Sequence, residues 1–200
     1  MRAASRKERF DQARLINIAN GLTAVRVLLV PVVAFLLISG RFRSALVVFA
    51  VCGISDALDG LLARWLRQRT VVGFYLDPIA DKLLVATSFI VLAIVKVIPD
   101  WLTVAVISRD IFILIGSILI LLLIGTEGIQ VTALSKANTV MQLATVLYFL
   151  SVRAFPGVLD RFAAGLEAGA TDVVVVLCAA TTLLSGVQYL VAGIARLSRA

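Results

Sequence analysis

Six apolar stretches alternate with short polar or breaker-rich stretches along the chain. Each is close to the roughly 20 residues that an α-helix needs to cross a bilayer. The pattern therefore predicts an all-α membrane protein with six transmembrane helices in a single domain over residues 15–200. The apolar stretches cover approximately residues 17–39, 44–64, 73–96, 101–125, 134–154 and 172–195.

Composition supports this class and narrows the chemistry. Hydrophobic residues make up 61% of the chain and the mean hydropathy is +1.05, whereas soluble domains are about 45–50% apolar. The chain has no histidine, which excludes histidine general bases and the usual zinc sites. Cys52 and Cys178 both fall in apolar stretches, so we interpret them as small core residues and not as a disulfide framework.

The basic residues predict the orientation in the membrane. Eleven lysines and arginines lie in the two tails and the even-numbered loops, and five lie on the opposite side. The positive-inside rule then puts both termini in the cytoplasm. Residues 1–14, which are polar and basic, are expected to form a short amphipathic juxtamembrane helix, with no cleavable signal peptide. Because the net charge of +7 is spread over short loops, we interpret it as this bias and expect no nucleic-acid partner.

Four aspartates, Asp56, Asp59, Asp77 and Asp81, lie in one window where the second apolar stretch ends and the third begins. The first two are three residues apart and the last two are four apart, so each pair shares one face of a helix. Four carboxylates in a small volume cannot all ionise without compensation. Magnesium or manganese, which take oxygen ligands, would supply it, and two such ions can clamp a displacement at phosphorus.

The residues around the aspartates also fit a ligand site. Gly60, Gly73 and the small Ala63 allow a ligand to approach the backbone closely, and Arg64 can pair with a phosphate. The alternatives are helix packing for the small residues, a positive-inside anchor for Arg64, and caps or ion pairs for the aspartates. A different class, a divalent-cation transporter with the aspartates as its filter, should carry acidic residues through the membrane depth, whereas here they gather on one side.

The string DALDGLLARWLRQRTVVGFYLDPIADK resembles the signature of the CDP-alcohol phosphotransferase (phosphatidyltransferase) family, D-x-x-D-G-x-x-A-R followed by G-x-x-x-D-x-x-x-D. The resemblance implies a six-helix, homodimeric membrane enzyme that moves a substituted phosphate from a CDP-linked donor to an alcohol and releases CMP. It implies that Asp56, Asp59, Asp77 and Asp81 bind two divalent ions, Mg²⁺ or Mn²⁺, and that Asp81 is also the catalytic base. It further implies a CDP-donor pocket lined by Asp56, Gly60, Ala63, Arg64, Gly73 and Asp77.

The first apolar stretch resembles the phosphatidyl-transferring bacterial branch, which implies a multi-pass protein of the bacterial cytoplasmic membrane with its active site facing the cytoplasm. Asn17, Asn20, Thr23 and Arg26 recur there every three residues. An unpaired arginine in lipid would be expensive, so Arg26 should face the site, and we expect Asn20 and Arg26 to help hold the donor phosphates. The alternative is a stripe of interhelical hydrogen bonds.

Two later strings, VISRDIFIL and LSKANTVMQLATVL, resemble the cardiolipin synthase branch. That resemblance implies CDP-diacylglycerol as donor and phosphatidylglycerol as acceptor, with Arg109 and Lys136 as candidates to hold the acceptor phosphate. The alternative for Arg109 is an intramembrane pair with Asp110 or with another helix. The alternative function is a phosphatidylglycerophosphate synthase that uses glycerol 3-phosphate, although Asn138 stands where such enzymes tend to have a second lysine. The sixth apolar stretch carries no expected site residue.

Overall fold

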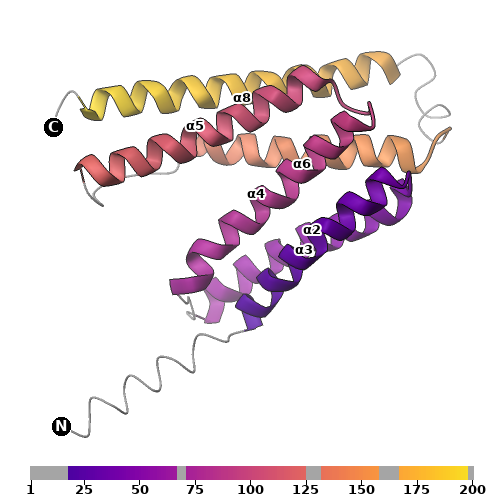
Figure 1. Cartoon of the computed structure of the whole chain (residues 1–200), viewed down its shortest axis with the longest axis horizontal. Helices are drawn as coiled ribbons and strands as arrows, with labels where there is room; N and C mark the ends of the chain where they lie inside the picture. Colours follow the sequence, from indigo (N-terminus) through magenta and orange to yellow (C-terminus); the bar gives the residue numbers. More distant parts are fainter. Residues whose placement is uncertain (1–17, 67–70, 125–131, 158–166, 198–200) are drawn as a thin grey trace, which may run out of the picture. The chain divides into compact units, whose positions relative to one another are not determined.

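The computed structural model describes residues 18–66, 71–124, 132–157 and 167–197, with side chains described within residues 25–55, 82–119, 132–157 and 169–195. These residues form six α-helices and no strand, which confirms the all-α prediction for the described part of the chain (Figure 1). The expected juxtamembrane helix over residues 1–14 lies outside it. The helices are α2 (Ile18–Ile38), α3 (Phe42–Leu66), α4 (Val71–Ile94), α5 (Asp100–Ile124), α6 (Ala133–Ala154) and α8 (Glu167–Leu197).

Two of the described helices are long and apolar enough to cross a membrane. The qualifying spans are Asp100–Leu119 in α5 and Gly169–Ala195 in α8. Shorter apolar segments, such as Val25–Ile38 and Lys82–Ile94, occur in other helices. Among the described residues these two are the candidate spans, and the expectation of six spanning helices is not confirmed.

The chain divides into two compact units, the first ending at Ser88 and the second beginning at Phe89. In the first unit, α2 and α3 pack side by side (Figure 1). The turn between them ends α2 with Gly40 at a φ of +69°, while the Arg41 amide donates to the Leu36 carbonyl at 2.9 Å. Glycine fits this left-handed position because it has no Cβ to clash with the backbone. The core of this unit includes Leu37 and Phe49, whose side chains are fully buried.

In the second unit, α8 packs against both α5 and α6 (Figure 1). Tyr148 of α6 is hydrogen-bonded to Thr171 of α8 at 3.0 Å, near the start of α8, whereas Asn138 lies opposite Thr182. Sequence positions therefore rise along α8 as they fall along α6, so the two helices run antiparallel. Hydrogen bonds of this kind help to hold helices together where lipid supplies no hydrophobic driving force between them.

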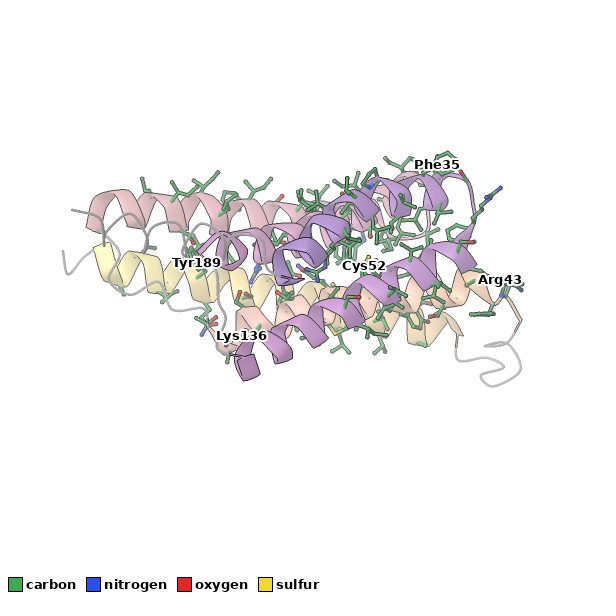
Figure 2. The ribbon with its side chains drawn as sticks, turned by 90° about the horizontal axis from the view of Figure 1, so that it is seen from below. Phe35, Arg43, Cys52, Lys136 and Tyr189 are labelled. Carbon is green, nitrogen blue, oxygen red and sulfur yellow. The ribbon has the colours of Figure 1, made fainter. Side chains whose placement is uncertain are left out.

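Large apolar side chains cover the outward faces of the helices in both units. Leu28, Phe112 and Ile194 expose 70%, 68% and 66% of their surface. Phe35 points away from the ribbon in the same way (Figure 2). Such large apolar faces would be unfavourable in water. They are suited to lipid, because apolar side chains need no hydrogen-bond partner there, whereas exposed polar groups would.

A close contact joins the later halves of α5 and α8. Tyr189 of α8 lies against Gly116 of α5, and its hydroxyl is hydrogen-bonded to Ser117 Oγ at 2.6 Å (Figure 2). A Cβ added at Gly116 would stand 2.9 Å from Cε1 of the Tyr189 ring, which is closer than real contacts allow. The absence of a side chain at Gly116 is therefore what lets the tyrosine reach Ser117.

Gly116→Ala is expected to lower the thermal unfolding midpoint of the purified protein in detergent by about 2–8 °C, because overpacking typically costs about 1–3 kcal/mol. The matched control is Gly53→Ala in α3, where an added Cβ meets nothing within 4 Å. That variant should be unchanged or slightly more stable, since alanine favours helix. Equal midpoints for the two variants would show that the Tyr189 contact is not a packing constraint.

Candidate active site

The signature residues lie at the end of one helix and in the first part of the next helix along the chain. Asp56 and Asp59 lie in the later part of α3, and Asp77 and Asp81 lie in the first three turns of α4. Because both segments are helical, each pair shares a face as expected. The side chains of the four aspartates, and those of Gly60, Ala63, Arg64 and Gly73, lie outside the described side chains, so their convergence on one site stays a prediction.

The chemistry of the aspartate set fits a hard divalent cation. Its donors are carboxylate oxygens, which Mg²⁺ and Mn²⁺ prefer over softer ligands. Among the described side chains, no group of three or more histidine, cysteine, aspartate or glutamate residues could hold a metal ion. That the four signature aspartates hold a metal ion stays a prediction.

Pro78 lies inside α4 although proline favours a helix start. Pro78 suits the first turn of a helix, which would start α4 near Asp77. Instead, α4 begins at Val71 and continues through Pro78. Neighbouring helices and local adjustment make proline tolerable within apolar helices, so the fixed φ of Pro78 is accommodated inside the element.

Arg26 of α2 is buried, with 3% of its surface exposed. This agrees with the expectation that an arginine in the first apolar stretch would turn away from lipid, where its charge would be costly. The side chains of Asn20 and Thr23 lie outside the described side chains, and Asn17 lies outside the described residues. A contact between Arg26 and a donor phosphate therefore stays a prediction.

Arg109 of α5 connects three helices of the second unit. Its Nη2 donates to Ser135 Oγ of α6 at 2.9 Å and to Ser185 Oγ of α8, and its Nη1 donates to the carboxylate of the adjacent Asp110 at 2.7 Å. The side chain is 6% exposed. The stem passes over Gly186 of α8, where a Cβ would lie 3.6 Å from Cγ of the arginine. The alternative given for Arg109, a pair with Asp110 or with another helix, is therefore observed in both forms.

The same contact ties Arg109 to the start of the helix that carries Lys136, the other candidate acceptor-binding residue. Ser135, which bonds Arg109, is the neighbour of Lys136 in the first turn of α6. Lys136 is exposed and lies near the beginning of the helix (Figure 2). Thr132 caps this end, its Oγ1 accepting from the Ser135 amide at 3.2 Å. A helix N-terminus favours anions through its free amides and dipole.

Asn138 lies one turn further along α6 and is fully buried. Its Oδ1 accepts a hydrogen bond from Thr182 Oγ1 of α8 at 3.0 Å. Asn138 stands where phosphatidylglycerophosphate synthases tend to have a second lysine, and here its side chain forms a hydrogen bond between two helices. A lysine here would place a cation in a buried position and would need a counter-charge.

Sequence reasoning missed the contribution of α8. Thr182 and Ser185, which bond Asn138 and Arg109, are polar residues three apart inside a long apolar stretch. Their spacing marks one face of a helix, which was the available signal. It could not reveal their partners, because Arg109 is 76 residues from Ser185 in the chain.

The sequence is similar to phospholipid-synthesising enzymes of animals and bacteria. It is 34% identical over 155 residues to a human cardiolipin synthase (CMP-forming), and 34% identical over 162 residues to a probable cardiolipin synthase of Drosophila melanogaster; each alignment covers 70% of this chain. The chain spans about half the length of these relatives, 52% and 50%. It is 33% identical over 186 residues to a probable phosphatidylglycerophosphate synthase of Mycobacterium tuberculosis, with 89% of this chain and 82% of that protein covered.

The match to a protein family covers most of the chain. The CDP-alcohol phosphatidyltransferase family matches residues 16–197, which include the signature and all six described helices from α2 to α8. Together with the two long apolar helices, this match indicates a membrane protein. The chain belongs to the CDP-alcohol phosphatidyltransferase family.

Proposed function

We propose that this chain transfers the phosphatidyl group of CDP-diacylglycerol to the free glycerol hydroxyl of phosphatidylglycerol, giving cardiolipin and CMP. The observation that carries the donor half is the complete aspartate signature at the ends of α3 and α4. The acceptor half is supported by the similarity to the human cardiolipin synthase and by the strings that contain Arg109 and Lys136.

The reaction is a direct displacement at the phosphorus that carries diacylglycerol. The acceptor hydroxyl forms the new P–O bond, the P–O bond to the CMP phosphate breaks, and CMP leaves. An alcohol is a weak nucleophile near neutral pH, and a carboxylate beside it can take its proton as attack proceeds. Asp81 is assigned this role, since aspartate is the base that a chain without histidine offers within the signature.

The remaining signature residues are assigned to metal and donor binding. Members of this family generally use divalent metals, and Asp56, Asp59, Asp77 and Asp81 are assigned as ligands for two Mg²⁺ or Mn²⁺ ions. The chemistry that such ions supply is neutralisation of the diphosphate charge and stabilisation of the leaving CMP oxygen. Lining of the cytidine and diphosphate pocket is assigned to Asn20, Arg26, Gly60, Ala63, Arg64 and Gly73.

The acceptor is assigned to the region where α5, α6 and α8 meet. Arg109 bonds Ser135 and Lys136 is the next residue of α6, so both are assigned as positive charge near the first turn of this helix. The phosphodiester of phosphatidylglycerol carries one negative charge, whereas the phosphomonoester of glycerol 3-phosphate carries about two near neutral pH. Asn138 adds no cation and is bonded to Thr182, so the charge of this region suits the diester.

The second candidate is a phosphatidylglycerophosphate synthase. It is favoured by the mycobacterial relative, which matches more of the chain than the animal cardiolipin synthases do, at nearly the same identity. The donor chemistry would be the same in both cases. The difference lies wholly in the acceptor, glycerol 3-phosphate instead of a second lipid.

The membrane arrangement belongs to the same proposal. Six spanning helices over residues 15–200 would follow a cytoplasmic segment of residues 1–14 in the bacterial cytoplasmic membrane. Both termini and the active site would face the cytoplasm, where CDP-linked donors are available, and two copies would form a homodimer. The distribution of lysine and arginine supports this orientation.

Purified protein in mixed micelles with CDP-diacylglycerol and Mg²⁺ or Mn²⁺ is expected to release CMP at least about tenfold faster with phosphatidylglycerol than with glycerol 3-phosphate. Cardiolipin should appear by mass spectrometry of the lipid product. Faster release with glycerol 3-phosphate, with phosphatidylglycerophosphate as the product, would establish the second candidate instead. No CMP release with either acceptor would refute both.

Asp81→Asn is expected to lower kcat by about 10²–10⁴-fold, because an amide cannot accept the proton of the attacking hydroxyl. The matched control is Asp100→Asn in the first turn of α5. Asp100 forms an exposed pair with Lys96 at 2.5 Å, and such pairs contribute little, so activity should stay within twofold. If Asp81→Asn keeps full activity, the assignment of the base is wrong.

Removal of divalent metal with EDTA should stop CMP release, and added Mg²⁺ or Mn²⁺ should restore it. Carboxylates gathered at one site need the cation for charge compensation. Asp59→Ala should require more metal for half-maximal activity, whereas Asp100→Asn should not. Unchanged activity in excess EDTA would contradict the assignment of the aspartates as metal ligands.

A further inference from the structure

Two hydroxyl residues of α8 lie buried in the second unit. Thr182 and Ser185 expose 1% and 2% of their surface. Many serine and threonine side chains in apolar helices satisfy themselves by bonding back to a carbonyl of their own helix, as Thr181 does to Leu177 at 2.9 Å. Thr182 and Ser185 bond across to other helices, and Thr182 also contacts Cys178 of α8 through a side-chain hydrogen bond. Their hydroxyls therefore act on side chains outside α8.

The bond from Ser185 orients the guanidinium of Arg109. Nη2 is shared between Ser185 of α8 and Ser135 of α6, and Nη1 is held by Asp110. Three partners fix both the position and the plane of a rigid fork. Nε of Arg109 is buried and has no hydrogen-bond partner among the described residues. One donor of an oriented cation thus remains for a ligand oxygen.

The bond from Thr182 acts in the same way on Asn138. Thr182 Oγ1 occupies Oδ1 of the amide at 3.0 Å, and this fixes the rotation of the amide group. Nδ2 of Asn138 is buried without a hydrogen-bond partner among the described residues. A buried donor that lacks a partner is costly, and more so in an apolar surrounding. Both oriented side chains therefore present a free N–H group, which suits an oxygen-rich ligand.

We propose that Ser185 and Thr182 are positioning residues for the acceptor. They hold Arg109 and Asn138 so that their free N–H groups meet oxygens of the phosphoglycerol headgroup. The inference rests on the proposed function and deepens it, because it assigns part of the acceptor recognition to α8, which carries no signature residue. A binding group contributes most to affinity when neighbouring side chains hold it in the productive geometry, because a loosely held group must be ordered on binding.

A purely structural role for the same hydroxyls predicts different behaviour. Interhelical hydrogen bonds at any point along α8 would then stabilise the helix packing equally. Thr171 provides the comparison, because it also bonds from α8 to α6, through Tyr148 at 3.0 Å, but far from Arg109 along the helix. Loss of the Thr171 hydroxyl tests packing without touching Arg109 or Asn138.

The experiment measures CMP release by the full chain in mixed micelles, with phosphatidylglycerol and CDP-diacylglycerol varied separately. Ser185→Ala and Thr182→Val should each raise the KM for phosphatidylglycerol about three- to tenfold, as expected for the loss of one hydrogen bond that orients a binding group. The KM for CDP-diacylglycerol and kcat should stay within twofold. Thr171→Val should leave all three constants within twofold, and Ser185→Thr, which keeps the hydroxyl, should restore the acceptor KM.

Several results would overturn the proposal. The first is an unchanged KM for phosphatidylglycerol in both Ser185→Ala and Thr182→Val while the wild type is active. That result would overturn the role of α8 and leave the proposed function intact. If Thr171→Val raised the KM for phosphatidylglycerol as much as Ser185→Ala and Thr182→Val do, the hydroxyls of α8 would act only through helix packing. If Ser185→Ala does not fold, Ser135→Ala removes the other hydroxyl on Nη2 and must raise the same constant. A wild type that releases no CMP with either acceptor overturns both this inference and the proposed function.

Discussion

The hydrogen bonds of the buried Arg109 guanidinium are the interaction on which the packing of α5, α6 and α8 depends. A buried cation in an apolar chain is unfavourable unless its donors are satisfied and its charge is compensated. Here Asp110 supplies the charge, and hydroxyls from α6 and α8 supply oxygen atoms. The requirement to satisfy one side chain thereby draws three helices together at one depth. Tyr189 and Thr182 give α8 further polar contacts with α5 and α6.

The two halves of the proposed reaction are built in different ways. The aspartate signature assigned to the donor side lies within one continuous stretch, the end of α3 and the start of α4, so helical spacing alone puts its carboxylates on shared helix faces in pairs. The acceptor side uses residues from three helices, with 26 residues between Arg109 and Ser135 and 76 between Arg109 and Ser185.

Much of the fold was predictable because apolar stretches and their breaks directly reflect helices in a membrane protein. Gly40 ends α2 where a left-handed residue is needed, and Pro99 precedes α5. The burial of Arg26 also followed from the cost of a cation in lipid. Pro78 by itself would favour a helix start near Asp77, but α4 begins at Val71 and continues through it.

By itself, the sequence determined the helical class, the approximate helix boundaries and the identity of the aspartate motif, because these depend on residues close together in the chain. Only the tertiary structure decided that Arg109 and the first turn of α6 meet, that Asn138 is committed to Thr182, and that α8 takes part in this region. The physical reason is that hydroxyl and amide groups bond equally well to many partners. Which partner each finds depends on how the helices pack, and no local spacing encodes that.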